Sequence, residues 1–239
     1  MKVLSLFDGI SCGQLALQRA GIKVDNYYAS EIKKEAISVT QKHFPNTIQL
    51  GDVTKIKLIN NDQLVCENGV SLFQGIDLLI GGSPFQNFSM IGDGNGLEGE
   101  KSILFFEYLR LLKELKPKYF LLENVKMSKD NKLKIDEMLG VVGIEINSSL
   151  VSIQNRPRVY WTNIPNVIPP KDLNINFQDY IGIGDLEEAK VNYTPSRIKM
   201  WNNGEGINGL GTCDNITNKN KIRCITRKQD RSPNSKKYQ

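Results

Sequence analysis

Three short motifs place side chains that could bind a nucleoside at the ends of apolar runs. The segment Phe7–Gly13 follows one such run and carries two glycines four residues apart, which let a loop pass close to a ligand. Their spacing matches neither the dinucleotide fingerprint GxGxxG nor a phosphate-binding loop. Glu31 could accept hydrogen bonds from a ribose diol and Asp52 could meet an adenine amino group, although either acid alone is more often a helix cap or a surface charge. The three motifs in this order indicate a nucleoside-bearing cofactor without a required pyrophosphate.

The elements that must position these residues are predicted from the hydrophobic pattern. Apolar runs of strand length alternate with segments of helical period over the first two-thirds of the chain, which predicts βα units, an α/β fold and a largely parallel sheet. Asn68-Gly69 is expected to turn a hairpin between residues 63–67 and 70–73. The other predicted strands are 2–6, 25–30, 47–50, 76–82, 119–122, 143–152 and 158–162, and the predicted helices are 13–20, 33–44, 102–115 and 129–139.

The pattern changes after Asn163, where prolines and asparagines become frequent and the periodicity weakens. We therefore expect one domain over residues 1–164 and a smaller, irregular, basic region over residues 165–239. Residues 217–239 hold eight basic residues and one acidic residue, a net charge of +7, whereas the first 216 residues carry −2 and the whole chain +5. Such a polarity fits a basic flank that faces a polyanion, and equally a solvated, disordered terminus.

The histidine and cysteine content argues against a metal site. His43 is the only histidine, and the four cysteines are far apart with no CxxC pair. The apolar runs are shorter than the roughly 18 residues of a membrane span. The apolar stretch at the N-terminus is too short for a secretory signal. We expect no metal, no membrane and a reducing, cytoplasmic compartment.

The segment Gly81–Ser89 resembles the catalytic loop of the DNA cytosine-5 methyltransferases, which have Pro-Cys-Gln where this chain has Pro84-Phe85-Gln86. The other motifs of that family appear in the same order: Phe7–Gly13, Glu31, Asp52, Glu123-Asn124-Val125 and Gln154–Arg158. The resemblance covers about residues 2–163. The motif sequences are most similar to those of phage and bacterial members. We therefore expect the protein in the cytoplasm of a bacterial or phage-infected cell, near the nucleoid.

The resemblance implies a Rossmann-like methyltransferase fold with a mostly parallel sheet and a small recognition region. It implies S-adenosylmethionine as methyl donor, S-adenosylhomocysteine as product and double-stranded DNA as partner, with a role in DNA methylation or restriction-modification. The residues it assigns to the cofactor are Phe7, Asp8, Gly9, Ile10, Cys12, Gly13, Glu31, Ile32, Asp52, Val53 and Pro84.

The family chemistry explains the remaining motifs. Cytosine C5 is a poor nucleophile until a cysteine thiolate adds to C6, and the base must be flipped out of the stack to be reached. By resemblance, Glu123 would hold N3 and the exocyclic amine of the base. Arg156 and Arg158, which match the family's Gln-x-Arg-x-Arg motif, would contact the base O2 and the adjoining backbone.

Phe85 stands at the position of the nucleophile. A benzyl side chain cannot add to C6, and its bulk would occupy part of the space of a flipped cytosine. Cys12 lies in the cofactor loop and Cys66 in the predicted hairpin, so neither replaces the nucleophile by position. We predict that the chain as written does not methylate. An engineered substitution and a natural loss in a protein kept for binding both agree with Phe85.

Family members usually continue into two further motifs, including a terminal helix that returns to the cofactor domain. This leads to the expectation of either a truncated chain or a second polypeptide that supplies those motifs. Two other functions remain open: a catalytically dead DNA-binding or regulatory homologue, and a cytosine-5 methyltransferase that acts on transfer RNA. The target sequence and the oligomeric state are not predicted.

Overall fold

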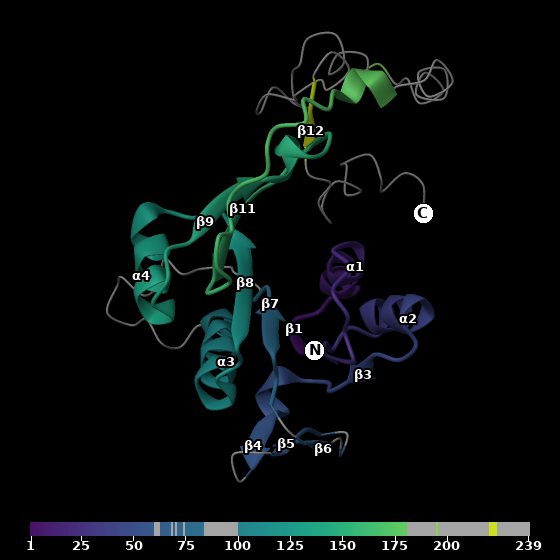
Figure 1. Ribbon diagram of the computed structural model, residues 1–239, viewed down its shortest axis with the longest axis vertical. Helices are drawn as coiled ribbons and strands as arrows, with labels where there is room; N and C mark the ends of the chain where they lie inside the picture. Colours follow the sequence, from purple (N-terminus) through teal and green to yellow (C-terminus); the bar gives the residue numbers. More distant parts are fainter. Residues whose placement is uncertain are drawn as a thin grey trace. The chain divides into compact units, whose positions relative to one another are not determined.

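The computed structural model describes residues 1–59, 63–67, 69, 71–73, 75–83, 100–180, 195 and 220–223 (Figure 1). The helices are α1 (Cys12–Arg19), α2 (Lys34–His43), α3 (Glu100–Leu115) and α4 (Lys129–Leu139), with short 3-10 turns η1 (Val53–Lys55), η3 (Ser148–Leu150) and η4 (Phe177–Tyr180). The strands are β1 (Lys2–Leu6), β2 (Asn26–Ser30), β3 (Ile48–Gln49), β4 (Lys57–Ile59), β5 (Gln63–Val65), β6 (Ser71–Phe73), β7 (Leu78–Gly81), β8 (Tyr119–Val125), β9 (Ile144–Asn147), β10 (Gln154–Asn155), β11 (Pro157–Thr162) and β12 (Ile222–Arg223).

The chain divides into two compact units. The first contains Met1–Glu145 and Arg158–Ile168, and the second contains Ile146–Pro157 and Pro169–Gln239. In the second unit, β10 pairs in parallel with β12, and the Lys221 ammonium donates to the carbonyls of Ser149 and Ser152 at 2.6 and 3.1 Å. The expected domain boundary after residue 164 stays a prediction.

A seven-stranded sheet in the order β3-β2-β1-β7-β8-β11-β9 is the frame of the described part of the chain. Within this sheet, β3, β2, β1, β7 and β8 are parallel to one another, and β11 is antiparallel to β8. The strand order reverses between β1 and β7, because the chain moves outward from β1 to β3 and then returns to the other side of β1. In open α/β sheets, ligands bind beyond the carboxyl ends of the strands at such a switch point.

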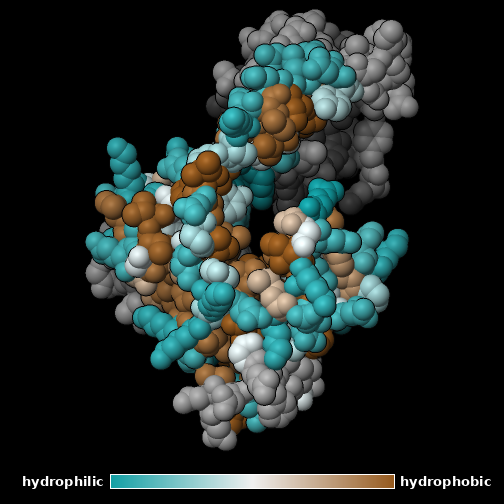
Figure 2. Space-filling model, viewed as in Figure 1, coloured by the Kyte–Doolittle hydropathy of each residue, from teal (hydrophilic) through white to brown (hydrophobic). Residues whose placement is uncertain are grey.

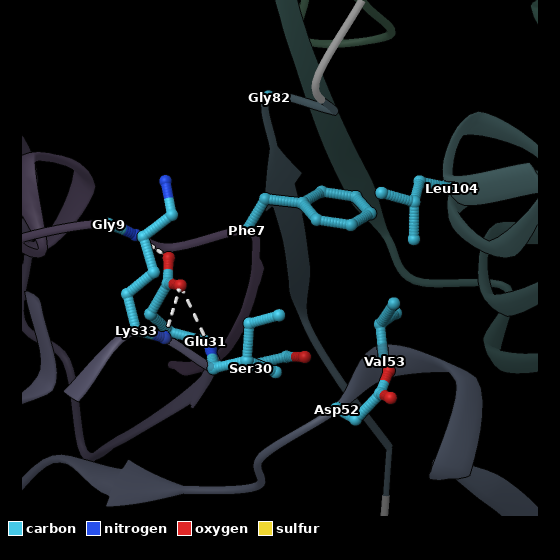
Figure 3. A pocket seen from close by; sticks show the side chains of 10 residues that line it. Phe7, Gly9, Ser30, Glu31, Lys33, Asp52, Val53, Gly82 and Leu104 are labelled. Atoms are coloured by element: carbon cyan, nitrogen blue, oxygen red, sulfur yellow. Dashed lines mark hydrogen bonds between the residues drawn. The ribbon is translucent and has the colours of Figure 1, made fainter. Parts of the chain in front are cut away.

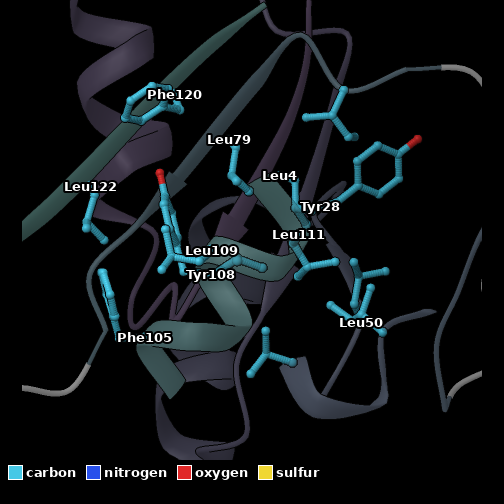
Figure 4. Close-up of a cluster of buried hydrophobic side chains, with 14 of the residues drawn as sticks. Leu4, Tyr28, Leu50, Leu79, Phe105, Tyr108, Leu109, Leu111, Phe120 and Leu122 are labelled. Carbon is cyan, nitrogen blue, oxygen red and sulfur yellow. The ribbon is translucent and has the colours of Figure 1, made fainter. Parts of the chain in front are cut away.

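Both faces of the sheet are covered. On one face, Leu4, Leu79 and Leu122 pack with Phe105 and Tyr108 of α3, as Figure 4 shows. The same core includes Ile135 of α4. On the other face, Val3, Tyr27 and Ile80 form a second buried cluster against Leu17 of α1. Residues of β1 therefore alternate between two cores, which explains why its sequence reads as a continuous apolar run.

Local signals set the helix ends. The Ser128 hydroxyl accepts a hydrogen bond from the Asn131 amide and caps α4, and Gly140 ends that helix with φ of 67°. The left-handed conformation at the residue after a helix favours glycine, which has no Cβ. α2 ends at His43, two residues before Pro45, because the residue before a proline disfavours the helical conformation.

The expected α/β fold with a mostly parallel sheet is confirmed, whereas the ends of two predicted strands differ from expectation by more than two residues and a further strand, β4, was not predicted. β8 continues through Glu123 and Asn124 to Val125, because β11 pairs along its full second half. β9 ends at Asn147, where the Asn147 carboxamide oxygen caps η3. β4, which the sequence did not reveal, pairs with β5 of the predicted hairpin. Asn68 of that hairpin's turn lies outside the described residues.

Charged and apolar side chains are mixed on the visible surface. Figure 2 shows hydrophobic groups over α4 and the turn after it, where the exposed apolar side chains are Leu133, Met138 and Val142. α4 buries Ile135, whereas Leu133 and Met138 of the same helix are exposed. No helix in the described ranges has the length and apolar character needed to cross a bilayer.

Candidate functional site

A cavity of about 300 Å³ lies at the carboxyl ends of β1, β2 and β7, at the switch point of the sheet (Figure 3). This volume is at the lower end of the range for small-molecule sites. Figure 3 shows the Phe7 ring pointing across the cavity toward Leu104 of α3. The lining residues are Phe7, Gly9, Ser30, Glu31, Ile32, Lys33, Asp52, Val53, Gly82 and Leu104.

The Glu31 carboxylate is fixed by the backbone. One oxygen accepts hydrogen bonds from the amides of Ile32 and Lys33, both at 2.9 Å, and the other accepts from the Gly9 amide at 2.8 Å. A carboxylate has about four acceptor positions, so one remains for a ligand hydroxyl group. Charge-assisted bonds of this kind are shorter and stronger than neutral ones. Glu31 therefore both joins the ends of β1 and β2 and offers an acceptor to the cavity.

The loop after β1 is held in an uncommon backbone conformation. Phe7 and Ser11 have φ of 57° and 59°, and Gly9 between them has φ of 62°. Left-handed φ at a non-glycine residue costs about 1–3 kcal/mol and concentrates at functional sites. The Asp8 amide donates to the carbonyl of Ser30 at 3.1 Å and keeps the loop beside β2. The strain presents the Phe7 ring and the Gly9 amide to the same cavity.

Asp52 lies across the cavity from Glu31 (Figure 3). Its carboxylate accepts a hydrogen bond from the Thr54 amide at 2.9 Å and caps η1. The Ser30 hydroxyl donates to the carbonyl of Gly51 at 2.8 Å, and the Arg110 guanidinium of α3 donates to the carbonyl of Ile56 at 2.9 Å. These bonds fix the segment that carries Asp52 and Val53 from both sides.

A second group of polar side chains lies next to the cavity at the ends of β7 and β8. Glu123 and Arg158 form an ion pair with 2.6 Å between Oε1 and Nε. A Cβ added at Gly82, which lines the cavity, would lie 3.0 Å from Glu123 Oε2. The buried Asn124 amide group donates to the carbonyl of Ser83 at 3.4 Å. The carboxylate is thus adjacent to the cavity, and the residue before position 84 is anchored.

The structure brings together six of the eleven residues that the resemblance assigns to the cofactor: Phe7, Gly9, Glu31, Ile32, Asp52 and Val53. Asp8, Ile10, Cys12 and Gly13 belong to the same loop or to the start of α1 but do not line the cavity. Pro84 lies outside the described residues. Their part in cofactor binding stays a prediction.

The predicted catalytic residues fall in different parts of the chain. Glu123 and Arg158 are paired in the first unit. Arg156 belongs to the second unit, where its amide donates to the Asn147 side chain at 2.9 Å. Phe85 lies outside the described residues. The described ranges contain no group of three or more His, Cys, Asp or Glu side chains placed to hold a metal ion.

Sequence reasoning missed four lining residues. Leu104 arrives from α3, which packs on the sheet from a distant part of the chain, so no local signal indicates it. Lys33 is two residues after Glu31, and its amide donates a hydrogen bond to the Glu31 carboxylate. Ser30 is the last residue of β2 and Gly82 follows the last residue of β7, so the rule that ligands bind beyond strand ends could have found both.

Residues 1–168 match the model of the family described as C-5 cytosine-specific DNA methylase. The orphan methyltransferase M.SPRI of Bacillus phage SPR is 32% identical over 216 residues, which cover 84% of this chain and 46% of that protein. The orphan methyltransferase M.Rho11sI of Bacillus phage rho11s is 35% identical over 173 residues, 67% of this chain and 32% of its own length. The type II methyltransferase M.Bsp6I of Bacillus sp. (strain RFL6) is 29% identical over 222 residues, 84% of this chain and 66% of its own length.

A solved structure agrees with the family match. A prophage-encoded protein of E. coli, described as a DNA modification methyltransferase, superposes with a TM-score of 0.51 and 25% sequence identity over 68% of this chain and 46% of its own. The chain thus spans between a third and two-thirds of the length of these curated relatives. A family model that matches residues 1–168, on the sheet that carries the cavity, shows that the chain belongs to the C-5 cytosine-specific DNA methylases.

Proposed function

We propose that this chain is the cofactor- and base-binding body of a DNA cytosine-5 methyltransferase that binds S-adenosylmethionine and double-stranded DNA. The observation that carries the proposal is the cavity lined by Phe7, Glu31 and Asp52, which adjoins the Glu123–Arg158 pair through Gly82. A nucleoside needs an acceptor for its ribose hydroxyls and an apolar surface for its base, and this cavity offers both. Polar and apolar side chains together line one small volume, which fits a single bound nucleoside.

The lining residues divide the binding task. The acceptor position left on Glu31 suits a ribose hydroxyl, and the Asp52 carboxylate suits the amino group of adenine. Phe7, Val53 and Leu104 give the apolar surface against which a base can pack. S-adenosylmethionine supplies an electrophilic methyl group on a sulfonium. Because family membership shows the methyltransferase class only, these assignments are proposals.

We infer that Glu123 and Arg158 act on the target base. A carboxylate that accepts from the exocyclic amine of cytosine, beside a guanidinium that donates to O2, matches the polar edge of that base. Arg158 Nε lies 2.6 Å from Glu123 Oε1, so the two charged groups are side by side. The anchored Ser83 leads directly to the segment that contains position 85.

The chain as written is expected to bind without transferring the methyl group, because Phe85 has no nucleophilic atom. The test is transfer of radiolabelled methyl groups from S-adenosylmethionine to duplex DNA by the native chain, by Phe85→Cys and by Phe85→Ser. Phe85→Cys is expected to incorporate label, whereas the native chain and the serine variant, which opens the same space without a thiolate, are not.

Each variant is assayed alone and together with a second polypeptide that carries the remaining C-terminal part of M.SPRI, since the chain spans 46% of that relative. Incorporation by Phe85→Cys in either arm supports the proposal. No incorporation in both arms, with the variant folded, contradicts it.

Phe85 also favours a second candidate, a DNA-binding or regulatory homologue that has lost catalysis. That function predicts DNA affinity that falls steeply with salt, because Lys and Arg contacts release counterions from the phosphates. Competition between duplex DNA and transfer RNA for the native chain tests the substrate class in the same assay. Stronger competition by transfer RNA would favour the RNA methyltransferase alternative.

A further inference from the structure

The strained loop after β1 is supported by four buried or partly buried polar side chains, which we call the Asp8 cluster: Asp8, Ser11, Tyr27 and Thr40. The Tyr27 hydroxyl donates to Asp8 Oδ1 at 2.8 Å, and the Ser11 hydroxyl donates to Asp8 Oδ2. Tyr27 is 2% exposed and Ser11 is fully buried. Both oxygens of the Asp8 carboxylate are therefore satisfied within the protein.

Thr40 joins a third element to the cluster. Its hydroxyl lies 3.2 Å from the Ser11 hydroxyl and 3.4 Å from the carbonyl of Gly9, and the side chain is fully buried in α2. The contacts come from β2, from α2 and from the residue just before α1. Two elements, β2 and α2, thus hold one short loop through the hydroxyls of Tyr27 and Thr40, and Ser11 contributes a hydroxyl from within the loop.

The approach of α1 depends on Gly13. A Cβ there would lie 3.1 Å from the Tyr27 hydroxyl oxygen and 2.5 Å from Ile80 Cδ1. The absence of a side chain at this position lets the start of α1 lie against the tyrosine. Burial, the nearby Asp8 charge and the bond to Asp8 raise the pKa of Tyr27 far above its usual value, so the phenol stays protonated and remains a donor.

The cluster lies behind the cavity wall, whereas the residues it fixes form that wall. Phe7 and Gly9 line the cavity, and Asp8 between them does not. The Gly9 amide reaches Glu31 at 2.8 Å, so any movement of the loop also releases a bond to the residue that offers an acceptor to the ligand. The two left-handed non-glycine residues, Phe7 and Ser11, flank the carboxylate that the hydroxyls hold.

We propose that Tyr27, Ser11 and Thr40 are positioning residues that hold the Phe7–Gly13 loop in its strained, ligand-ready conformation. Tyr27 and Ser11 act through the Asp8 carboxylate, and Thr40 acts through the Ser11 hydroxyl and the Gly9 carbonyl. The ligand part of this inference rests on the proposed function, whereas the loop conformation is a property of the free protein. Asp8 thereby supports the loop from outside the lining of the cavity.

The first test is amide hydrogen exchange of the free chain. Tyr27→Phe removes one hydroxyl and keeps the ring in its core, and exchange of the Asp8 and Gly9 amides is expected to become about tenfold faster, because local opening becomes easier. The amides of β7 should not change. Tyr28→Phe is the matched control, because it deletes the same atom one residue along, on the opposite face of the sheet.

The second test is calorimetric titration with S-adenosylhomocysteine. Tyr27→Phe and Thr40→Val are each expected to raise Kd about fivefold, the effect of one hydrogen bond, with DNA affinity unchanged. Tyr27→Phe combined with Asp8→Asn should bind only slightly more weakly than Asp8→Asn alone, because the proposed effect of the hydroxyl on the ligand passes through that carboxylate. A merely structural tyrosine would weaken both ligands and give additive losses.

The two arms separate the two claims. If the native chain does not bind S-adenosylhomocysteine, the proposed function fails and the exchange measurement alone decides on the Asp8 cluster. Equal exchange at Asp8 and Gly9 in the native chain, Tyr27→Phe and Thr40→Val overturns the positioning role. Faster exchange without a change in Kd overturns the link to the ligand.

Discussion

At the scale of the residue, carboxylates surrounded by donors fix several parts of the first unit. Glu31 accepts three backbone bonds at the cavity, and Asp136 of α4 also accepts three bonds. The Asp136 donors are the indole of the fully buried Trp161 at 2.6 Å, the Gly143 amide at 3.0 Å and the Lys132 ammonium at 2.9 Å. Such carboxylates are costly to protonate or replace because each donor would lose its partner.

Asp136 gives a pH prediction. Its partial burial acts to raise its pKa, but the bonds from Lys132, Gly143 and Trp161 outweigh burial and hold the pKa below the usual value of 3.8. A lowered folded-state pKa means that the carboxylate stabilises the fold above pH 3.8 and that this stability is lost as the pH falls through the folded pKa.

Urea unfolding at several pH values checks this. Asp136→Asn is expected to lower the free energy of unfolding by about 1–3 kcal/mol at neutral pH, and the difference from the native chain should shrink in acid. Asp130→Asn, on the exposed first turn of the same helix, is the control. A difference that stays constant down to acid pH would show that the Asp136 charge is not the stabilising feature.

At the scale of the element, close packing of β9 and β11 with the end of α4 depends on Gly143. A Cβ there would lie 2.6–2.7 Å from Trp161 Nε1, Trp161 Cε2 and Val159 Cγ1. Trp161 and Val159 are buried and have little room to shift. The turn between α4 and β9 is therefore sterically restricted to glycine at this position.

Gly143→Ala is accordingly expected to lower the free energy of unfolding by about 1–3 kcal/mol through overpacking. Gly140→Asn is the matched control in the same turn. A Cβ at position 140 meets open space and asparagine tolerates the φ of 67°, so the free energy of unfolding should fall by less than about 1 kcal/mol. Thermal and urea unfolding measure both. Equal losses for the two variants would contradict the steric explanation.

Most elements of the main sheet could be predicted from the sequence because buried parallel strands give plain apolar runs. β1 and α4 have the expected bounds. The extension of β8 through Glu123 and Asn124 could not be predicted, because polar residues interrupt the apolar run and only pairing with β11 continues the strand. β4 is too short, with three residues, to give a signal of its own.

The site was predictable where its residues follow strand ends. Phe7, Glu31 and Asp52 stand out because acids and glycines end apolar runs. The pairing of Asp8 with Tyr27 could not be predicted, since Tyr27 and Tyr28 are adjacent aromatics and either could face α1. Leu104 depends on helix packing across the sheet, which a local pattern does not encode.

At the scale of the whole molecule, family membership and the position of the cavity agree on a C-5 cytosine-specific DNA methylase body. The family match ends at residue 168, and the residues after it hold 12 basic and 8 acidic residues, a net charge of +4 out of +5 for the whole chain. Because the chain spans less than two-thirds of these relatives, the activity of a whole protein stays a proposal. Cofactor binding, however, depends on residues that this chain contains.

The cofactor site is tested most directly by calorimetric titration of S-adenosylhomocysteine into the native chain, Glu31→Gln and Glu35→Gln. Glu35 lies exposed in the first turn of α2, so its variant removes the same charge away from the cavity. We expect one saturable site. Glu31→Gln should weaken its affinity at least about tenfold and Glu35→Gln should leave it unchanged, because Glu31, unlike Glu35, has charge-assisted bonds in the cavity wall. Absence of saturable binding to the native chain, or equal affinity of the two variants, would contradict a cofactor site at this switch point.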